Sequence, residues 1–377
     1  MFWGTVLKIA YIITRSDVIG GASAHLLDLV FGVKNRGFDV KIFVGGKGIV
    51  FQKAVNMGIP CRSVEYLVRK ISPINDVRAF FELVKALREY SPNVVHVHSA
   101  KAGILGRLAS HHLSVPVIYT AHGWPFTDGV STPARFLYKN IERFMARYTS
   151  KIITVSDHDN YIALEKKVAE QKKLITIHNG IPDTSRKNRF KSLNEENKSS
   201  PVKLIMVARF ERQKDQRSLI EALEPLKRYE WELDFIGDGP LKESAITLCR
   251  KCGLENKIKF LGSRDDVPIR LESADILLLI SRWEGLPITI VEAMRASLPV
   301  IASNVGGVRE QIEHGRTGFL ISRGAVTELT KVIQTLLDNP ILRQEMGVKA
   351  RIRYEKEFYF EKMLNNTLDV YRDVVKG

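Results

Sequence analysis

The sequence predicts an α/β protein with two doubly wound parallel-sheet domains. Short apolar runs rich in β-branched residues alternate with amphipathic helical stretches along most of the chain. This alternation is typical of buried parallel strands joined by crossover helices. A single polar segment, residues 183–201, interrupts it. The chain has 377 residues, and that length accommodates two domains of about 150 residues each.

The first domain is expected over residues 1–182. Residues 7–14 form an apolar strand, which leads through a Gly pair into a helical pattern over residues 23–36, and residues 79–90 form a second amphipathic helix. Four more short strands are predicted at residues 40–44, 94–98, 117–120 and 152–156. Repeated βα units of this kind predict a sheet with helices on both faces.

The second domain is expected over residues 202–354. The polar and charged residues 183–201 are typical of a linker. Strand-like runs then resume at residues 202–207, 232–236, 258–261, 276–280, 300–302 and 318–321. From about residue 326 the chain is mostly helical, with an interruption near Pro340, because proline cannot continue a helix. We expect the C-terminal helix, residues 355–377, to pack back on the first domain.

Charge and composition narrow the classes of partner. The sequence has 57 Lys+Arg against 42 Asp+Glu, a net charge of +15, and most of the excess precedes residue 184. An anionic membrane surface and nucleic acid are the obvious partners of such a chain. No nucleic-acid-binding fold motif is present, so we expect no specific nucleic acid. A non-enzymatic nucleic-acid-binding protein remains the distant alternative.

The sequence also indicates a cytoplasmic protein that does not cross the bilayer. Its longest apolar runs are far shorter than the roughly 20 residues that a spanning helix needs. The apolar N-terminus lacks a small-residue cleavage site, so we expect no secretory signal. Cys249 and Cys252 have metal or redox spacing, but no second pair or nearby histidine would complete a zinc site. We expect them to pack inside a helical stretch.

Two groups of residues at predicted strand ends suggest phosphate binding. Gly20 and Gly21 follow the first strand, where the absence of side chains would let a ligand approach the backbone at a helix N-terminus. They are not a dinucleotide-binding GxGxxG fingerprint, which argues against a dehydrogenase. Arg209 and Lys214 follow the strand at residues 202–207, and two cations there can converge on one diphosphate. A plain turn and two solvated charges are the alternatives.

A third group, residues 284–292 with the sequence EGLPITIVE, follows the apolar strand at residues 276–280. Pro287 suits the first turn of a helix. Glu284 then lies on the loop before that helix, and Glu292 lies about a turn and a half into it. Carboxylates accept hydrogen bonds from sugar and ribose hydroxyls. The alternative is a helix with acidic residues near its positive end.

Residues 284–292 resemble the E-x7-E motif of retaining GT-B glycosyltransferases of family 4. Other segments agree with that family in its order across residues 7 to about 320: Gly20-Gly21, His96 with His98, Ala121-His122-Gly123, Asn179-Gly180-Ile181, Arg209 with Lys214, Gly237-Asp-Gly-Pro240, Phe260-Leu-Gly262 and Asn304-Val-Gly-Gly307. The segments ITRSDVIGGA and TAHGW are most similar to transferases that extend lipid-linked O-antigen or exopolysaccharide units.

The resemblance implies the GT-B fold, in which two Rossmann-like domains face each other across a cleft. It also implies that the C-terminal domain binds the nucleotide sugar and the N-terminal domain takes the acceptor. Its donor-binding residues would be Gly20, Gly21, Arg209 and Lys214 at the diphosphate, Leu286, Pro287 and Ile288 in the loop facing sugar and phosphate, and Glu292 at the ribose. Its catalytic residues would be Glu284, which holds donor-sugar hydroxyls, and His122, which lies near the reacting carbon.

No metal or other cofactor is expected. The leaving nucleoside diphosphate gains negative charge, and fixed cations with a helix N-terminus stabilise that charge without a metal ion. One feature argues otherwise, because Asp157-His-Asp159 follows a strand, as does the metal site of the other large glycosyltransferase fold, GT-A. We expect Asp157 or Asp159 to cap a helix instead.

Residues 135–148 predict a basic amphipathic helix. Its basic face is Arg135, Lys139, Arg143 and Arg147, and its apolar face is Leu137, Ile141, Phe144, Met145 and Tyr148. Such a helix suits an anionic membrane surface, although a core-packing helix with a solvated basic side has the same pattern. We expect a protein on the inner face of the cell membrane that glycosylates a lipid-linked glycan. The alternative is a family member that uses a small soluble acceptor.

Overall fold

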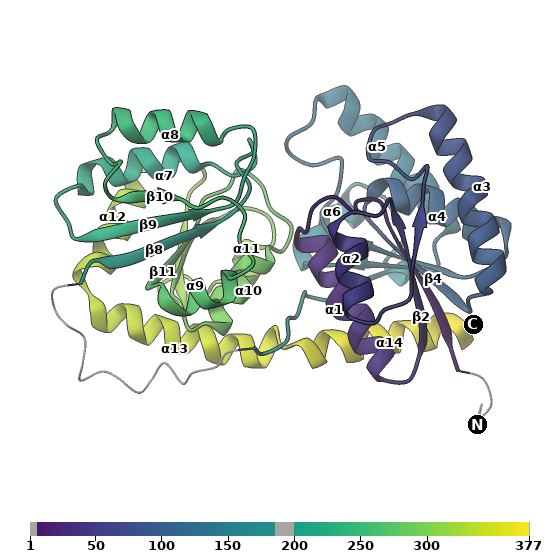
Figure 1. Cartoon of the computed structure of the whole chain (residues 1–377). Coiled ribbons are helices and arrows are strands. Elements are labelled where there is room, and N and C mark those ends of the chain that lie inside the picture. The colour runs from purple at the N-terminus through teal and green to yellow at the C-terminus, as the bar shows by residue number, and fades with distance from the viewer. Residues whose placement is uncertain (1–5, 185–199, 377) are drawn as a thin grey trace. The chain divides into compact units, whose positions relative to one another are not determined.

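The computed structural model describes residues 6–184 and 200–376 (Figure 1). They form two compact units, the first comprising residues 1–180 with 360–377 and the second residues 181–359. The predicted linker, residues 183–201, lies almost entirely outside the described residues. The second unit extends past the expected boundary at residue 354 because helix α13 (Pro340–Glu357) continues to Glu357.

The first unit has a seven-stranded parallel sheet. Its order, β3-β2-β1-β4-β5-β6-β7, reverses direction between β1 and β4. The strands are β1 (Lys8–Ile13), β2 (Asp39–Gly45), β3 (Cys61–Val64), β4 (Val94–His98), β5 (Val117–Ala121), β6 (Lys151–Thr154) and β7 (Leu174–Thr176). Ligands bind at the carboxyl ends of the strands beside such a reversal. A ligand site is therefore expected among the residues that follow β1 and β4.

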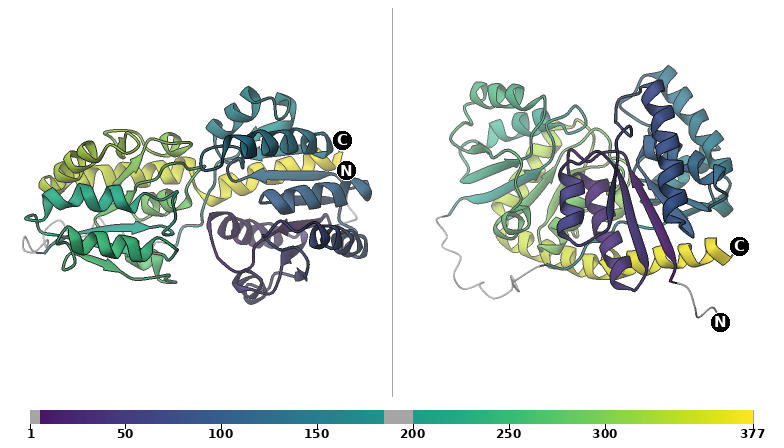
Figure 2. Two further views of the ribbon diagram at one scale, coloured as in Figure 1. Left: turned by 90° about the horizontal axis from the view of Figure 1, so that it is seen from above. Right: turned by 45° about the vertical axis from the view of Figure 1, so that its right-hand side comes forward.

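Helices cover both faces of this sheet. One face carries α1 (Gly21–Asn35), α2 (Ile49–Asn56) and α14 (Phe360–Lys376). The other carries α3 (Pro73–Tyr90), α4 (Ala100–His112), α5 (Thr132–Met145) and α6 (Asp157–Glu165). The right-hand view of Figure 2 shows α1 and α2, in purple, on the opposite side of the strands from α3, in blue.

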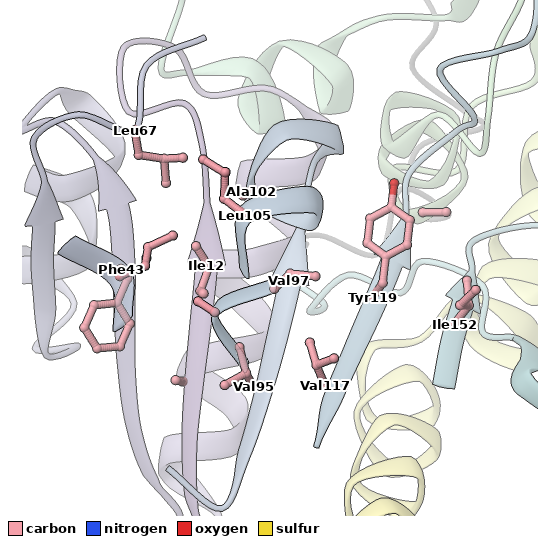
Figure 3. Close-up of a cluster of buried hydrophobic side chains, with 14 of the residues drawn as sticks. Ile12, Phe43, Leu67, Val95, Val97, Ala102, Leu105, Val117, Tyr119 and Ile152 are labelled. Carbon is pink, nitrogen blue, oxygen red and sulfur yellow. The ribbon is translucent and has the colours of Figure 1, made fainter. Parts of the chain in front are cut away.

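The core of the first unit lies on both faces of the sheet, as expected for parallel strands. Figure 3 shows the face beneath α3 and α4, where Ile12, Val97 and Tyr119 point from successive strands into one cluster. On the opposite face Tyr11 and its neighbours pack against α1 and α14. Successive strand residues are therefore buried alternately on the two sides.

Helix α14 completes the first unit from the far end of the chain. Its Phe360 ring packs against α1 so closely that a Cβ atom on Gly32 would lie 2.6 Å from the ring. Arg36 and Glu361 form an ion pair between the same two helices. The predicted C-terminal helix thus begins at Phe360 rather than near residue 355, and it packs on the first sheet.

The second unit has a six-stranded parallel sheet in the order β10-β9-β8-β11-β12-β13. Its strands are β8 (Val202–Val207), β9 (Trp231–Ile236), β10 (Ile258–Phe260), β11 (Ile276–Leu279), β12 (Val300–Ser303) and β13 (Gly318–Ile321). Its helices are α7 (Gln216–Leu223), α8 (Lys242–Lys251), α9 (Val267–Ser273), α10 (Ile288–Arg295), α11 (Val308–Gln311), α12 (Val326–Asp338) and α13. Figure 1 shows α7 and α8 on one side of this sheet and α9, α10 and α13 on the other.

Two remaining expectations concern buried and membrane-spanning segments. Cys249, in α8, and Cys252, directly after it, both belong to the hydrophobic core of the second unit. Burial raises the pKa of the Cys249 thiol to about 11, so the group is a packing residue there. None of the helices in the described part of the chain is long and apolar enough to cross a bilayer.

Candidate functional site

The loop between β8 and α7 carries the two predicted cations of the second unit. Arg209 is partly exposed and its Nη1 lies 2.8 Å from Glu211 Oε1. The Lys214 side chain is only 16% exposed and its Nζ pairs with the carboxylate of Glu284. The backbone holds this loop against β11, because the Asp215 amide donates to the Ile280 carbonyl at 2.9 Å. The two cations therefore have different partners.

Glu284 is held from two directions in a nearly closed environment. Its side chain is 6% exposed. One carboxylate oxygen accepts from Lys214 Nζ, and the other accepts from Gln213 Nε2 at 3.2 Å. Gln213 is itself fixed, because it also donates to the Trp283 carbonyl at 2.8 Å. The carboxylate is therefore positioned before any ligand arrives, and Lys214 neutralises it.

A glycine turn supports the loop that contains Glu284. Gly306 has a φ of +54°, and a Cβ atom there would lie 1.9 Å from the Glu284 carbonyl oxygen. The Gly307 amide donates to the Gly285 carbonyl at 2.9 Å. A side chain at residue 306 is incompatible with both its backbone conformation and this close approach. The predicted Asn304-Val-Gly-Gly307 segment thus holds the backbone of the Glu284 loop in place.

Helix α10 begins directly after that loop. Pro287 is its N-cap and has no side-chain oxygen to offer the first amides; Gln311 Nε2 donates to the Pro287 carbonyl at 3.0 Å and fixes the turn. Leu286 is buried and Ile288 half-buried, while Glu292 lies half-buried in the second turn. The predicted loop and both glutamates thus gather near the N-terminal end of α10. The first amides of a helix favour anions.

In the first unit, the predicted glycines lie at the start of α1. Gly20 is the N-cap residue, and its amide donates to Ser23 Oγ at 2.8 Å. Gly20 and Gly21 are both exposed. A Cβ atom on Gly20 would have no protein atom within 4 Å. The fold of the first unit therefore does not require glycine at residue 20.

Four histidines surround the carboxyl ends of β4 and β5. His96 and His98 are two residues apart on β4, and both point to the side of the sheet that carries α1. His122 follows β5, and His25 belongs to α1. His98 Nδ1 lies 3.1 Å from His122 Nε2. The His25 ring packs edge-on to His122 with a centroid distance of 5.1 Å, and the His96 and His98 centroids are 4.2 Å apart.

These four imidazoles are neutral near neutral pH. Burial lowers the pKa of His25 to about 4 and that of His96 to about 3. Burial, assisted by the neighbouring histidines, also holds the pKa values of His98 and His122 well below their ordinary range. Desolvation disfavours a charged imidazole. The carboxyl end of the first sheet therefore offers uncharged donors and acceptors.

Tyr371 of α14 anchors this histidine group from below. Its hydroxyl lies 2.7 Å from His96 Nδ1, and it donates to the Tyr11 hydroxyl at 3.1 Å. His96 Nε2 lies 2.6 Å from Thr120 Oγ1, so both ring nitrogens have a partner. The last helix of the chain is thereby hydrogen-bonded to the residues that back the predicted His122 site.

The Asp157-His-Asp159 segment has a different local role from the one predicted. The N-cap of α6 is Ser156, whose Oγ accepts from the Asp159 amide at 3.0 Å. Asp157 and Asp159 lie in the first turn, so the expectation that one of them is the cap residue is wrong. The Asp159 carboxylate is buried and accepts from Ser156 Oγ at 2.8 Å, because the serine side chain is short enough to reach both groups.

Helix α5 contains three of the four predicted basic residues, and Arg147 lies in the short 3-10 helix that follows it. The faces of α5 differ from the sequence prediction. Glu142 and Met145 are buried, and Glu142 pairs with the buried Arg107 of α4 at 2.8 Å. By contrast, Leu137 is 56% and Phe144 49% exposed. The predicted apolar face is therefore split, since part of it packs inward and part faces outward. The exposed part also includes Phe136, at 65%.

The sequence interpretation missed three side chains that shape these sites. Gln213 is adjacent to the predicted Lys214 but carries no charge to draw attention. His25 lies one turn into α1, four residues after Gly21, and its position at the predicted glycine turn was the available signal. Tyr371 is 249 residues beyond His122 in sequence, and nothing local indicates that the two lie in the same unit.

Comparisons with known proteins cover nearly all of the chain. Residues 19–185 match the family described as Glycosyltransferase Family 4, and residues 186–353 match Glycosyl transferases group 1. An Escherichia coli UDP-Gal:alpha-D-GlcNAc-diphosphoundecaprenol alpha-1,3-galactosyltransferase is 29% identical over 83% of each chain. A Bacillus anthracis N-acetyl-alpha-D-glucosaminyl L-malate synthase is 26% identical over 98% of each. The crystal structure of Anabaena HepE with UDP-glucose has a TM-score of 0.83 at 22% identity, covering 97% of this chain and 100% of HepE.

Proposed function

This chain belongs to the family 4 type of glycosyltransferases with the GT-B fold, and we propose that it is a retaining enzyme acting on a lipid-linked glycan. It transfers a hexose or N-acetylhexosamine from a nucleotide sugar, specifically a UDP-sugar. It works in the cytoplasm at the inner face of the cell membrane, in the synthesis of a bacterial surface polysaccharide. The observation that carries the proposal is the Lys214–Glu284–Gln213 cluster at the start of α10.

In this proposal the second unit binds the donor. Lys214 and Arg209 neutralise the diphosphate, and the first amides of α10 add to the positive potential. Glu284 accepts hydrogen bonds from hydroxyls of the sugar, and Glu292 accepts them from the ribose. The backbone of Leu286, Pro287 and Ile288 faces sugar and phosphate. Gly20 and Gly21 supply the contact of the first unit with the diphosphate, which the exposure of both and the open space around Gly20 support.

The bond between the anomeric carbon and the diphosphate oxygen breaks as the acceptor hydroxyl forms a new bond on the same face. The leaving phosphate oxygen takes the proton of that hydroxyl, so the reaction needs no separate base and retains the anomeric configuration. The carbon develops oxocarbenium character, and positive groups at the diphosphate lower the barrier. His122, as a neutral imidazole, hydrogen-bonds the donor sugar near this carbon. We propose that no metal ion takes part.

The choice of donor and acceptor draws on the relatives. The Escherichia coli enzyme is named for UDP-galactose and for an undecaprenol-linked acceptor, and Anabaena HepE was crystallised with UDP-glucose. A UDP-sugar and a lipid-linked acceptor follow by analogy with the first of these. The Bacillus anthracis relative, named for a malate acceptor, favours the second candidate, a family member with a small soluble acceptor.

Helix α5 supports the lipid-linked acceptor. Phe136, Leu137 and Phe144 are exposed beside the basic Lys139 and Arg147. Exposed apolar side chains that insert among lipid headgroups, with cations beside them, are the features of an interfacial helix. We propose that this outward surface of α5 binds an anionic membrane. Helix α3 of the same unit also has exposed apolar side chains, namely Ile74, Val77 and Phe81.

A donor screen tests the reaction. Purified protein is incubated with UDP-, GDP- and ADP-sugars in the presence of EDTA, and nucleotide release is measured. We expect release from one UDP-sugar, unchanged by EDTA and lost in Glu284→Gln. With an acceptor, the anomeric coupling constant of the product identifies retention by NMR. An inverted product, or release abolished by EDTA, would overturn the retaining or the metal-free part of the proposal.

Vesicle flotation separates the two acceptor classes. We expect the protein to float with vesicles that contain anionic phospholipid and to stay in solution with zwitterionic ones. High salt should weaken this binding, because salt screens the attraction between the basic residues and the lipid surface. Equal partitioning in both cases, together with transfer to a soluble sugar acceptor, would favour the small-acceptor candidate instead.

A further inference from the structure

Three of these four histidines have the arrangement of a metal-ligand set. His25, His98 and His122 each place one ring nitrogen within 4.8 Å of a ring nitrogen of the other two. They come from three separate elements, α1, β4 and the turn after β5, so the fold rather than local sequence brings them together. Zn²⁺ binds imidazole nitrogen at about 2.0–2.1 Å, which puts tetrahedral ligand atoms roughly 3.3 Å apart.

The hydrogen bonding of this group is incomplete. His98 Nδ1 and His122 Nε2 share one hydrogen bond at 3.1 Å. Yet His25 Nδ1 and His98 Nε2 are buried and have no hydrogen-bond partner in the described residues. Buried polar atoms are normally paired, and leaving one unpaired destabilises the folded state. His96, two residues before His98 on the same strand, has both nitrogens paired, so among these four histidines the deficit falls on His25 and His98.

The chemistry of the trio selects one class of ligand. All three side chains are imidazoles, and an imidazole nitrogen has the lone pair that a metal ion needs. Imidazole suits late divalent transition metals, whereas Mg²⁺ and Ca²⁺ require oxygen ligands. His122 is partly exposed while His25 and His98 are buried, so an ion can reach the trio from the His122 side and keep a water as its fourth ligand.

We propose that His25, His98 and His122 bind one divalent transition-metal ion of the Zn²⁺ type, and that this ion inhibits the enzyme. On binding, the hydrogen bond between His98 and His122 is given up, and each of the three rings supplies one nitrogen lone pair to the ion while its proton is on the other nitrogen. His122 is then turned toward the ion and away from the sugar. The inhibitory part rests on the proposed role of His122 in transfer, whereas the binding part does not.

Zn²⁺ titration of the whole protein tests the binding part. We expect one equivalent to bind, measured by competition with a chromophoric chelator, and Co²⁺ to give the visible absorption of a tetrahedral site. In wild-type protein labelled with ¹⁵N at histidine, Zn²⁺ should shift the ring nitrogens of three histidines. This spectrum requires no substitution, so it decides the question even if a variant fails to fold.

Variants identify the ligands. His25→Gln, His98→Asn and His122→Gln should each weaken Zn²⁺ binding at least tenfold. The exposed neighbours His111 and His112 are themselves adjacent imidazoles, so the double variant His111→Ala/His112→Ala serves as the matched control and should retain the tight equivalent. Absence of a tight equivalent in wild type, or its loss only in the control, would overturn the site.

Activity then separates the two parts. With a nucleotide-sugar assay in place, stoichiometric Zn²⁺ should lower turnover at least tenfold, and EDTA should restore it. Tight binding at the trio without any loss of turnover would overturn the inhibitory part and also the proposed role of His122. Inhibition that persists in His25→Gln and His98→Asn would show that Zn²⁺ acts elsewhere and would overturn the proposal.

Discussion

Among the described residues, two ion pairs that are largely shielded from water, one in each unit, lie in contrasting places. Arg107 and Glu142 of the first unit are 0% and 2% exposed, with the Tyr119 ring 4.4 Å from the guanidinium. Lys214 and Glu284 of the second unit are 16% and 6% exposed, and they lie on loops at the carboxyl ends of β8 and β11. One pair is sealed between helices, and the other is on loops where its lysine keeps some contact with solvent.

In the proposed function, this difference separates a structural ion pair from one that binds a ligand. A ligand cannot reach Arg107, so its pairing with Glu142 only joins α4 to α5. Under the proposed function, Lys214 exchanges Glu284 for a phosphate oxygen, and Glu284 then accepts hydrogen bonds from hydroxyls. The same two charges therefore stabilise the fold where nothing can replace either partner and prepare a binding site where something can.

The largest expected effect is the removal of Glu142. Glu142→Ala leaves the Arg107 guanidinium buried without its counter-charge, and breaking such a pair costs about 3–5 kcal/mol. Chemical denaturation should show this loss of unfolding free energy, with kcat unchanged in protein that remains folded. Glu89→Ala removes an exposed partner of Arg62 and should leave the transition where it was. Equal effects of the two substitutions would contradict the contrast.

Lys214→Ala is the converse test. We expect kcat/KM to fall about 10²–10³-fold, the usual effect of removing one group that stabilises charge in the transition state, with only a minor loss of stability. Lys259→Ala is the matched control, because Lys259 pairs with Glu232 on the surface of the same unit at 2.6 Å. If steady-state kinetics give the same kcat/KM for the two lysine variants, Lys214 does not contribute to the site.

Two glycines at predicted motifs should respond in opposite ways. Gly306→Ala forces a left-handed residue with a Cβ against the Glu284 carbonyl, and such strain alone costs about 1–3 kcal/mol. Gly20→Ala has room for its Cβ, so the unfolding free energy should change little while donor binding weakens. Thermal unfolding and donor titration of both variants provide the measurement. Unaltered donor affinity in Gly20→Ala would argue that no ligand approaches this turn.

The exposed surface of α5 offers a smaller effect. The double variant Phe136→Ser/Leu137→Ser removes two outward side chains that make no core contact, so stability should be retained. Their loss should weaken binding to anionic vesicles about thirtyfold, since each apolar side chain contributes on the order of 1 kcal/mol when partly buried. Ile341→Ser, at an equally exposed residue of α13, is the control. If the double variant and Ile341→Ser co-sediment with anionic vesicles to the same extent, α5 is not the membrane contact.

The smallest expected effect is at Tyr371. Tyr371→Phe removes the hydroxyl that bonds His96 and Tyr11 and leaves a buried ring nitrogen without a partner, which costs about 1–2 kcal/mol. Urea denaturation measures this change. Tyr161→Phe, on the exposed face of α6, should have none. If Tyr371→Phe is as stable as wild type, α14 is held by its apolar contacts alone.

Sequence reasoning predicted the sheets well because buried parallel strands are short apolar runs that stand out from their surroundings. It reproduced β4, β8 and β13 residue for residue. It missed β3 (sequence CRSV) and the three-residue β7. Both are at the edges of the sheet, where neighbours on only one side demand less apolar character. The faces of α5 were misjudged because helical periodicity does not reveal which stripe packs inward.

The site was predictable where its residues follow each other in sequence. The Glu284 loop, Pro287 at the helix start and Glu292 form one continuous segment, so spacing was sufficient. Side chains that meet only through the fold were not predictable: Gln213 reaches Glu284 across 71 residues, and Tyr371 reaches His96 across 275. Their contributions depend on tertiary contacts that no local pattern encodes.

The return of α14 to the first unit has a consequence during synthesis on the ribosome. Phe360, Leu364 and Tyr371 belong to the core that also contains β1 and α1. The first unit can therefore close its core only after the whole second unit has been translated. At 5–20 residues per second, this delay is roughly 10–40 s, during which the apolar side of α1 lacks its cover. A nascent chain released early would expose that surface, so this protein depends on completion of its last helix for escape from aggregation.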